Sequence, residues 1–164
     1  MRFSIVADFL ALLQALREHD VQFIVVGGVC AVLHGAPIST LDLDIVHARD
    51  DENLAKLERA LTELDAVYRE ASWRQLRPTA ERLRSAGHHL LITRAGPLDI
   101  LGEIVGGRGY SELLPASQVV ELEGFSVSVL ELASLIAVKE ELHRERDLAV
   151  LPILRRLLEE GRRS

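Results

Sequence analysis

Three aspartates are the residues of this chain best placed to do chemistry. Asp42 and Asp44 alternate with apolar residues in Leu41-Asp-Leu-Asp-Ile-Val46, so in a β-strand both carboxylates point to one face. Asp99 lies among apolar neighbours in Pro97-Leu-Asp-Ile-Leu101, an awkward position for an acid unless that face opens on a site. Crowded like charges are costly unless a cation neutralises them. Three carboxylates from two strands are the usual protein contribution to a two-metal phosphoryl-transfer site.

The pattern around Asp42 and Asp44 has a second interpretation. Alternating aspartates are harmless on the solvent-facing side of an edge strand, and this segment alone does not separate the two possibilities. Asp99 favours a metal site over a solvent-facing edge strand. Glu103 lies four residues further along and would share the face of Asp99 if the strand continues that far.

Two glycines directly follow an apolar, β-branched segment. Gly27 and Gly28 come after Val21-Gln-Phe-Ile-Val-Val26, and a short helix is expected from Val29 to His34. Free backbone N–H groups at a helix start and the positive end of its dipole suit a phosphate. Glycine also allows the backbone to approach an anion closely. By itself, the pair is weak evidence for a ligand site and is more typical of an ordinary turn.

Other reactive side chains have simpler interpretations. His34, at a helix end, is typical of a surface or capping residue, and His88 and His89 alternate on a strand and cannot both face one ligand. Cys30 lies in an apolar helix and is expected to be buried and inert. As the single cysteine, it excludes an intramolecular disulfide and a cysteine-based zinc site.

Two further segments leave alternatives open. The five arginines between Arg69 and Arg84 could form a patch for RNA or another acidic acceptor, or a solvated, salt-bridged helix face. The glycine-rich segment Gly106-Gly-Arg-Gly109 could be a mobile loop at the site or a plain turn.

Apolar periodicity predicts the elements that position these residues. The first expected helix begins near residue 9, and further helices are expected at 29–34, 51–64 (with Asp50 as the N-cap), 130–143 and 146–160. The expected strands cover 21–26, 41–46, 88–93, 98–104, 119–122 and 125–129. The strands 88–93 and 98–104 are expected to form an antiparallel hairpin, whereas 67–87 gives no clear pattern. We expect an α+β fold class, with a helical pair at the C-terminus. We expect one domain over 1–164, with the sheet in 1–129 and the helices in 130–164.

In this order, the motifs resemble the polymerase-β-like nucleotidyltransferase superfamily. The similarity is greatest to small single-domain bacterial nucleotidyltransferases of the abortive-infection toxin type. It rests on Gly27-Gly28, Asp42-Leu-Asp44 and Asp99, and also on Leu135-Ile-Ala-Val-Lys139 followed by Arg144-Glu-Arg-Asp147. These stretches cover about 20–156, with a weak middle.

The resemblance implies a twisted mixed sheet with the carboxylate strands at its centre. It also implies the reaction and its cofactor. An NMP group would pass from an NTP, such as ATP, to an acceptor hydroxyl of RNA, protein or a small molecule, with Mg²⁺ or Mn²⁺ as the metal. Asp42 and Asp44 would hold both metal ions. Asp99 would bind the catalytic one and help activate the hydroxyl. A role as a toxin with an antitoxin partner would also fit.

The resemblance assigns the nucleotide-binding residues as well. Gly27 and Gly28 would approach the triphosphate, and Lys139 would reach a phosphate or organise the site from the helical side. Asp147 could pair with Arg144 or with Lys139.

Two departures from the superfamily pattern support an alternative. The loop Pro37-Ile-Ser-Thr40 lacks the basic residue that relatives often carry before the paired aspartates. Position 28 is glycine where many members have serine. The alternative is a catalytically weak or inactive relative that binds a nucleotide or a partner protein.

Composition limits the remaining function classes. The chain has 164 residues with a formal charge of −6, and only 4% of its residues are aromatic, which disfavours extensive, sequence-blind binding of nucleic acid. The longest apolar run, Phe23 to Leu33, is interrupted by glycines and too short to span a bilayer. No signal peptide is recognisable, so we expect a cytoplasmic protein without membrane contact.

Overall fold

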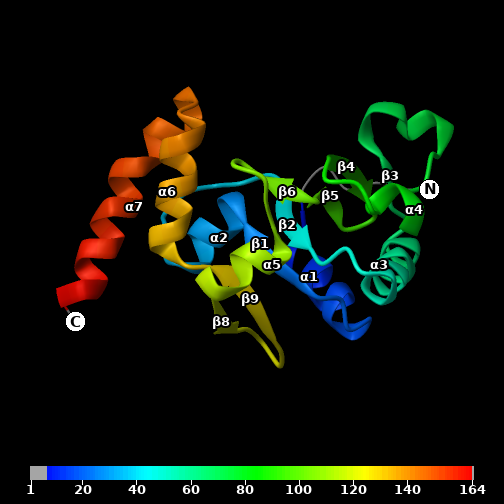
Figure 1. The fold of residues 1–164 in the computed structure, drawn as a ribbon, viewed down its shortest axis with the longest axis horizontal. Helices are drawn as coiled ribbons and strands as arrows, with labels where there is room; N and C mark the ends of the chain where they lie inside the picture. Colours follow the sequence, from blue (N-terminus) through cyan, green and yellow to red (C-terminus); the bar gives the residue numbers. More distant parts are fainter. Residues whose placement is uncertain (1–6, 164) are drawn as a thin grey trace.

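The computed structural model describes residues 7–163, and its central feature is a seven-stranded mixed sheet (Figure 1). In spatial order the strands are β3 (Val67–Tyr68), β4 (His88–Thr93), β5 (Gly96–Leu101), β2 (Leu43–His47), β1 (Phe23–Val26), β9 (Ser126–Leu130) and β8 (Ser117–Glu121). A separate two-stranded sheet joins β6 (Glu103–Ile104) and β7 (Arg108–Gly109). The expected α+β class with a twisted mixed sheet is confirmed.

The two strands that carry the predicted site lie side by side in the middle of the sheet. β2 pairs in parallel with β5 and antiparallel with β1, and β5 pairs antiparallel with β4. The antiparallel β4–β5 hairpin was expected from the sequence. Because β1, β2 and β5 are buried, they consist almost entirely of apolar residues, and the acids among them stand out.

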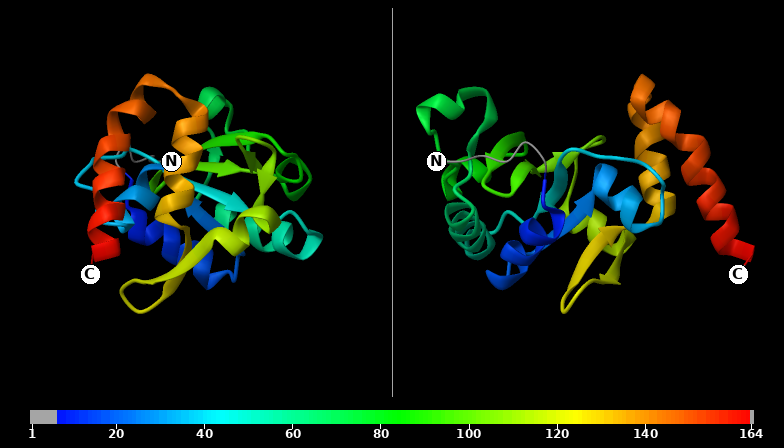
Figure 2. Two further views of the ribbon diagram at one scale, coloured as in Figure 1. Left: turned by 60° about the vertical axis from the view of Figure 1, so that its left-hand side comes forward. Right: turned by 180° about the vertical axis from the view of Figure 1, so that it is seen from behind.

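Helices lie at both ends of the molecule, on either side of the sheet. The α-helices are α1 (Phe9–Glu18), α2 (Gly27–Leu33), α3 (Asp51–Glu63), α4 (Ala80–Leu83), α5 (Tyr110–Leu113), α6 (Leu132–Leu142) and α7 (Glu145–Arg163), and the 3₁₀ helices are η1 (Arg69–Arg74) and η2 (Leu114–Ala116). The pair α6 and α7 lies at one end of the molecule, and α3 and α4 lie at the other (Figures 1 and 2). The expected C-terminal helix pair is therefore present.

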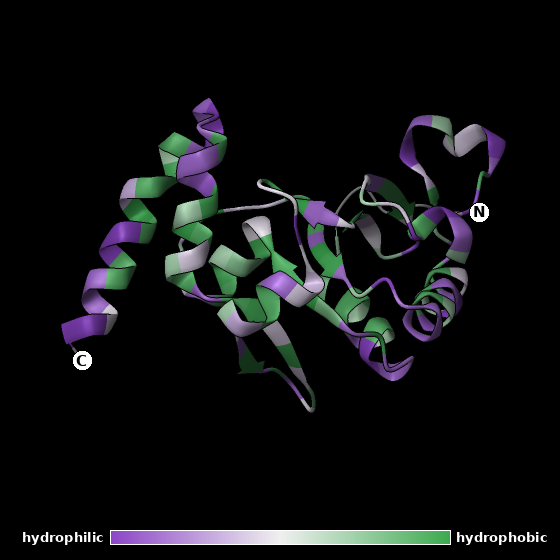
Figure 3. Cartoon of the chain, viewed as in Figure 1, coloured by the Kyte–Doolittle hydropathy of each residue, from purple (hydrophilic) through white to green (hydrophobic). Residues whose placement is uncertain are grey.

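Local sequence explains where the longer helices begin and which side they bury. Asp50 caps α3 by accepting a hydrogen bond from the backbone N–H of Asn53, as the sequence predicted. Leu54, Leu57 and Leu61 then recur on the buried face of α3. Along the outer helix α7, polar and apolar residues alternate, so that only one side packs inward (Figure 3). No helix within residues 7–163 is both long and apolar enough to cross a membrane.

The prediction that Glu103 extends the Asp99 strand is wrong. β5 ends at Leu101 because Gly102 lies directly against another loop: a Cβ atom there would be 2.3 Å from the backbone oxygen of Ser85. Glu103 therefore belongs to β6, and its carboxylate accepts a hydrogen bond from Arg49 at 3.1 Å.

The glycine-rich segment after β6 is a turn. Gly106 and Gly107 have φ angles of +80° and +69° and connect the two short strands β6 and β7. Glycine is favoured at both positions because this left-handed backbone is strained for other residues. Arg108, just beyond the turn, pairs with Glu141 of α6 at 2.9 Å.

Candidate active site

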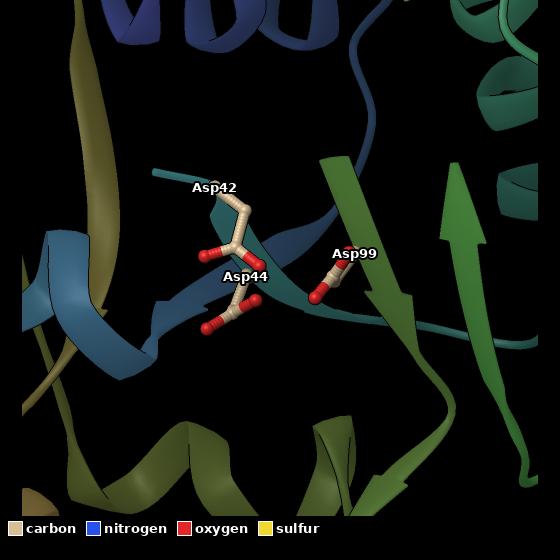
Figure 4. A group of neighbouring side chains, drawn as sticks. All are labelled: Asp42, Asp44 and Asp99. Atoms are coloured by element: carbon tan, nitrogen blue, oxygen red, sulfur yellow. The ribbon is translucent and has the colours of Figure 1, made fainter. Parts of the chain in front are cut away.

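The three predicted aspartates meet at the centre of the sheet (Figure 4). Asp44 and Asp99 stand directly opposite each other in the parallel β2–β5 pair. Asp42 precedes the first residue of β2, although the sequence predicted that the strand would include it, and its carboxylate still turns toward the other two. One oxygen from each carboxylate lies within 4.8 Å of the others. Within residues 7–163, no other group of three acidic, histidine or cysteine side chains has this spacing.

Within this cluster, Asp99 pairs with Arg69 at 2.7 Å, whereas residues 7–163 provide no ion pair to Asp42 or Asp44. Burial raises the pKa of Asp44 to about 8, and the neighbouring carboxylates Asp42 and Asp99 add to the rise. The pKa of Asp42 is also raised, first by burial and then by its contact with Asp99. A cation bound between these carboxylates would favour their charged forms.

Gly27 is required by the closeness of the backbone to Asp44. Val26, the last residue of β1, pairs with Asp44, so that Gly27 at the start of α2 lies beside its side chain. A Cβ atom on Gly27 would lie 2.1 Å from a carboxylate oxygen of Asp44, and its φ of +67° is left-handed. The strand-to-helix turn therefore brings bare backbone next to the carboxylates.

Gly28 faces a different neighbour. A Cβ atom there would lie 2.5 Å from the hydroxyl oxygen of Thr40, in the loop that leads to Asp42. The glycine at position 28 is thus required by the packing of Thr40. Gly28 does not line the cavity described below.

A buried ion cluster on α6 and α7 bounds the other side of the site. Asp147 is 1% exposed and accepts hydrogen bonds from Lys139 at 3.2 Å and Arg144 at 2.6 Å. The resemblance left the partner of Asp147 open between these two residues, and the structure shows both contacts. Burial opposes the charged carboxylate, but the two cations outweigh it and hold the pKa of Asp147 below its usual range.

A cavity of about 440 Å³ joins the aspartate cluster to this ion cluster. Its charged lining residues are Asp42, Asp44, Asp99, Asp147, Arg69, Lys139, Arg144 and Arg146. Gly27 also lines it, so that of the predicted site residues only Gly28 lies outside the lining. The cavity therefore has an acidic side on the sheet and a basic side on the helices.

Sequence reasoning did not assign two of the cationic residues of this cavity to the site. Arg146 lies within the Arg144–Asp147 stretch that carried the resemblance, and its charge lowers the pKa of Asp44 against the effect of burial. Arg69 donates a hydrogen bond to the carboxylate of Asp99 at 2.7 Å. The sequence suggested Arg69 only as one of five arginines in a possible patch, and the unclear periodicity of 67–87 gave no indication that it contacts Asp99.

The other arginines of the 69–84 stretch do not gather at one place. Arg77 and Arg84 pair with separate acids, Asp65 and Asp51. The remaining two stack on aromatic rings, Arg74 over Trp73 and Arg82 over Tyr68. The salt-bridged interpretation therefore describes Arg77 and Arg84.

The histidines and the cysteine make local contacts. The ring of His34 is hydrogen-bonded to the carbonyl of Leu130, and that of His88 to the carbonyl of Glu103. His89 instead contacts the hydroxyl of Tyr68 at 2.9 Å. Cys30 is fully buried, which raises its pKa to about 12, so the expectation that it is buried is confirmed.

Comparison with known proteins supports the fold assignment. No protein-family model and no curated protein matches the sequence. Among solved structures, the chain is similar to a "putative nucleotidyltransferase" from Thermotoga maritima, with a TM-score of 0.56 and 20% sequence identity. The similarity covers 93% of this chain and 94% of the other. The chain has a nucleotidyltransferase fold.

Proposed function

We propose that this protein is a metal-dependent nucleotidyltransferase that moves an NMP group from an NTP to an acceptor hydroxyl. The proposal rests on the cluster of Asp42, Asp44 and Asp99, whose carboxylate oxygens lie within 4.8 Å of one another. The cluster lines one side of a cavity, and basic residues line the side that faces it. The fold shared with the Thermotoga protein agrees with it.

The cluster fits a hard divalent cation. Asp42, Asp44 and Asp99 offer only oxygen ligands, which Mg²⁺ and Mn²⁺ prefer. Burial and the neighbouring carboxylates raise the pKa values of Asp42 and Asp44, and a bound cation would offset this effect. Mg²⁺ needs few protein ligands because water and substrate phosphates complete its coordination. When bound, such ions would stabilise the charge of the attacking and leaving oxygens.

The residues around the cluster suit a triphosphate. The bare backbone at Gly27 allows phosphate oxygens to approach the carboxylate strands closely. Lys139 and Arg144 on the opposite side are anchored by Asp147, and Arg146 adds a further positive charge to the lining. The basic side would hold the β- and γ-phosphates and leave the α-phosphate facing the aspartates.

In the reaction, the acceptor oxygen forms a bond to the α-phosphorus. The bond between that phosphorus and the bridging oxygen of the β-phosphate breaks, and pyrophosphate leaves. Asp99 lies at the edge of the cluster nearest β4 and is the group proposed to accept the hydroxyl proton. The two cations anchored by Asp147 offset the negative charge of the departing pyrophosphate.

A transfer assay with α-labelled NTPs tests this function. The purified protein is incubated with Mg²⁺ or Mn²⁺, each NTP in turn, and RNA, protein or small-molecule acceptors. We expect transfer of label by the wild type and a loss of about 100-fold or more in Asp42→Asn. The matched control is Asp51→Asn, which changes an exposed aspartate paired with Arg84.

The outcome of the assay separates the proposal from its alternative. No transfer to any acceptor, or equal transfer by Asp42→Asn, would contradict the enzymatic function. Nucleotide binding without transfer would identify the protein as an inactive binding relative, which the loop 37–40 without a basic residue would then explain.

We further propose a toxin role with an antitoxin partner, which rests on the sequence resemblance. Overexpression in a bacterial host is expected to arrest growth with the wild type and not with Asp42→Asn. Normal growth with the wild type would contradict this role without affecting the proposed chemistry.

A further inference from the structure

Arg69 reaches the aspartate cluster from two strands away. It lies at the start of η1, immediately after β3, and its side chain crosses β4 to reach Asp99 on β5. Its Nη2 atom donates to the Oδ1 atom of Asp99 at 2.7 Å and to the backbone carbonyl of Leu91 at 3.0 Å. The Leu91 carbonyl belongs to the sheet and fixes the guanidinium in place.

This contact involves one oxygen of the Asp99 carboxylate. Asp99 also makes a side-chain contact with Asp42, which contributes to the raised pKa of that neighbour. The side chain of Asp99 is 13% exposed, so it has little freedom to rotate away. Arg69 therefore restrains Asp99 while its carboxylate remains part of the three-aspartate group.

The conformation of Arg69 has a cost that its two hydrogen bonds must offset. Its Nε atom is buried and has no hydrogen-bond partner among the described residues. A buried, unpaired N–H group is unfavourable, so the contacts of Nη2 with Asp99 and Leu91 must hold the side chain there.

We propose that Arg69 is a positioning residue of the metal site, which holds the Asp99 carboxylate in the orientation that a divalent cation requires. The inference rests on the proposed function, because it concerns the same three aspartates. Carboxylate ligands are commonly oriented by such hydrogen bonds, and loss of the donor lowers metal affinity or activity about 10- to 100-fold.

A simple electrostatic view predicts the opposite sign. A guanidinium beside Asp99 repels a nearby cation, so removal of Arg69 would tighten metal binding if the residue acted only through its charge. The direction of the change in metal affinity therefore separates a positioning role from competition by a fixed charge.

The test is a titration with Mn²⁺ alone, in which the free ion is measured by electron paramagnetic resonance. The variants are Arg69→Ala, which removes the contact, and Arg69→Lys, which keeps the charge but lacks the Nη2 donor. Arg77→Ala is the matched control, because Arg77 follows in the same stretch and pairs with Asp65. Circular dichroism confirms that each variant has the wild-type secondary structure.

We expect both Arg69 variants to bind Mn²⁺ at least about 10-fold more weakly than the wild type, and Arg77→Ala to bind like the wild type. Equal or tighter binding by Arg69→Ala, or wild-type binding by Arg69→Lys, would overturn the inference alone. Failure of the wild type to bind Mn²⁺ would overturn the proposed metal site and, with it, the role of Arg69.

Discussion

Asp44 and Asp147 face the same cavity with opposite electrostatic environments. Asp44 has two carboxylate neighbours, and burial together with these like charges raises its pKa to about 8. Asp147 is more deeply buried, yet hydrogen bonds from Lys139 and Arg144 keep its pKa below the usual range. Burial alone therefore does not decide the charge of an acid in this protein. Its partners do.

The difference separates a structural acid from one available to a ligand. Asp147 uses its charge within the protein and joins α6 to α7. No ion pair to Asp42 or Asp44 is present within residues 7–163, so their carboxylates remain open to a cation from solution, which would favour their charged form. Matched changes in the two regions should therefore have different effects.

The largest effect is expected for Asp147→Asn. Loss of this charge leaves the Lys139 ammonium, 13% exposed at its side chain, without its buried counter-ion. Breaking a buried pair by removing one partner costs about 3–5 kcal/mol of the free energy of unfolding. Urea unfolding at neutral pH measures the change. A loss below about 1 kcal/mol would contradict the structural role of Asp147.

Divalent cations are expected to stabilise the wild type next most strongly. A ligand that binds only the folded protein adds about 2.7 kcal/mol to the free energy of unfolding at 100 times its dissociation constant. The same Mn²⁺ concentration should have little effect on Asp44→Asn, which lacks one of the three carboxylates. Equal stabilisation of both proteins would place the cation elsewhere.

Without metal, the pH dependence of stability should have opposite signs in the two regions. Because the pKa of Asp44 rises from 3.8 to about 8 on folding, its contribution is fully present below pH 4 and is lost as the pH rises toward 8. The lowered pKa of Asp147 gives a contribution that is lost as the pH falls below 4.

Asp44→Asn isolates the first of these slopes. At pH 8 and without metal, the variant should have a clearly higher free energy of unfolding than the wild type, and the two should converge near pH 4. Urea unfolding across this range, in the presence of a chelator, measures the difference. A variant that is less stable than the wild type at pH 8 would show that Asp44 is already neutralised within the protein.

The smallest effect is expected for Glu140→Gln on the exposed side of the helix pair. Glu140 accepts a hydrogen bond from Arg155 at 3.2 Å, and both side chains are about half exposed. Exposed ion pairs contribute about 0.2–1 kcal/mol, so the variant should unfold near the wild-type midpoint. A loss as large as that of Asp147→Asn would remove the distinction between buried and exposed pairs on these helices.

Local patterns predicted the aspartate cluster well. Strict alternation placed Asp42 and Asp44 on one side, and the apolar neighbours of Asp99 marked the strand beside them. The break after Val26 also located Gly27. These features depend on the two-residue period of a strand and on the residues that end it. Both can be recognised in a short stretch of sequence.

Contacts between distant segments could not be predicted in the same way. Arg69 reaches Asp99 across β4, which depends on how η1 packs on the sheet. Glu103 was misplaced because the strand ends where Gly102 meets the loop at Ser85. Neither feature has a periodic signal in the sequence.

We propose that the three aspartates hold a divalent cation beside a nucleotide. The most direct test is titration of the wild type and of an Asp42→Asn/Asp99→Asn double variant with Mn²⁺ at pH 8, with and without a non-hydrolysable NTP analogue. We predict saturable binding by the wild type, tighter with the analogue, and a loss of about 100-fold or more in the double variant. No saturable binding by the wild type, or equal affinity in both proteins, would contradict the claim.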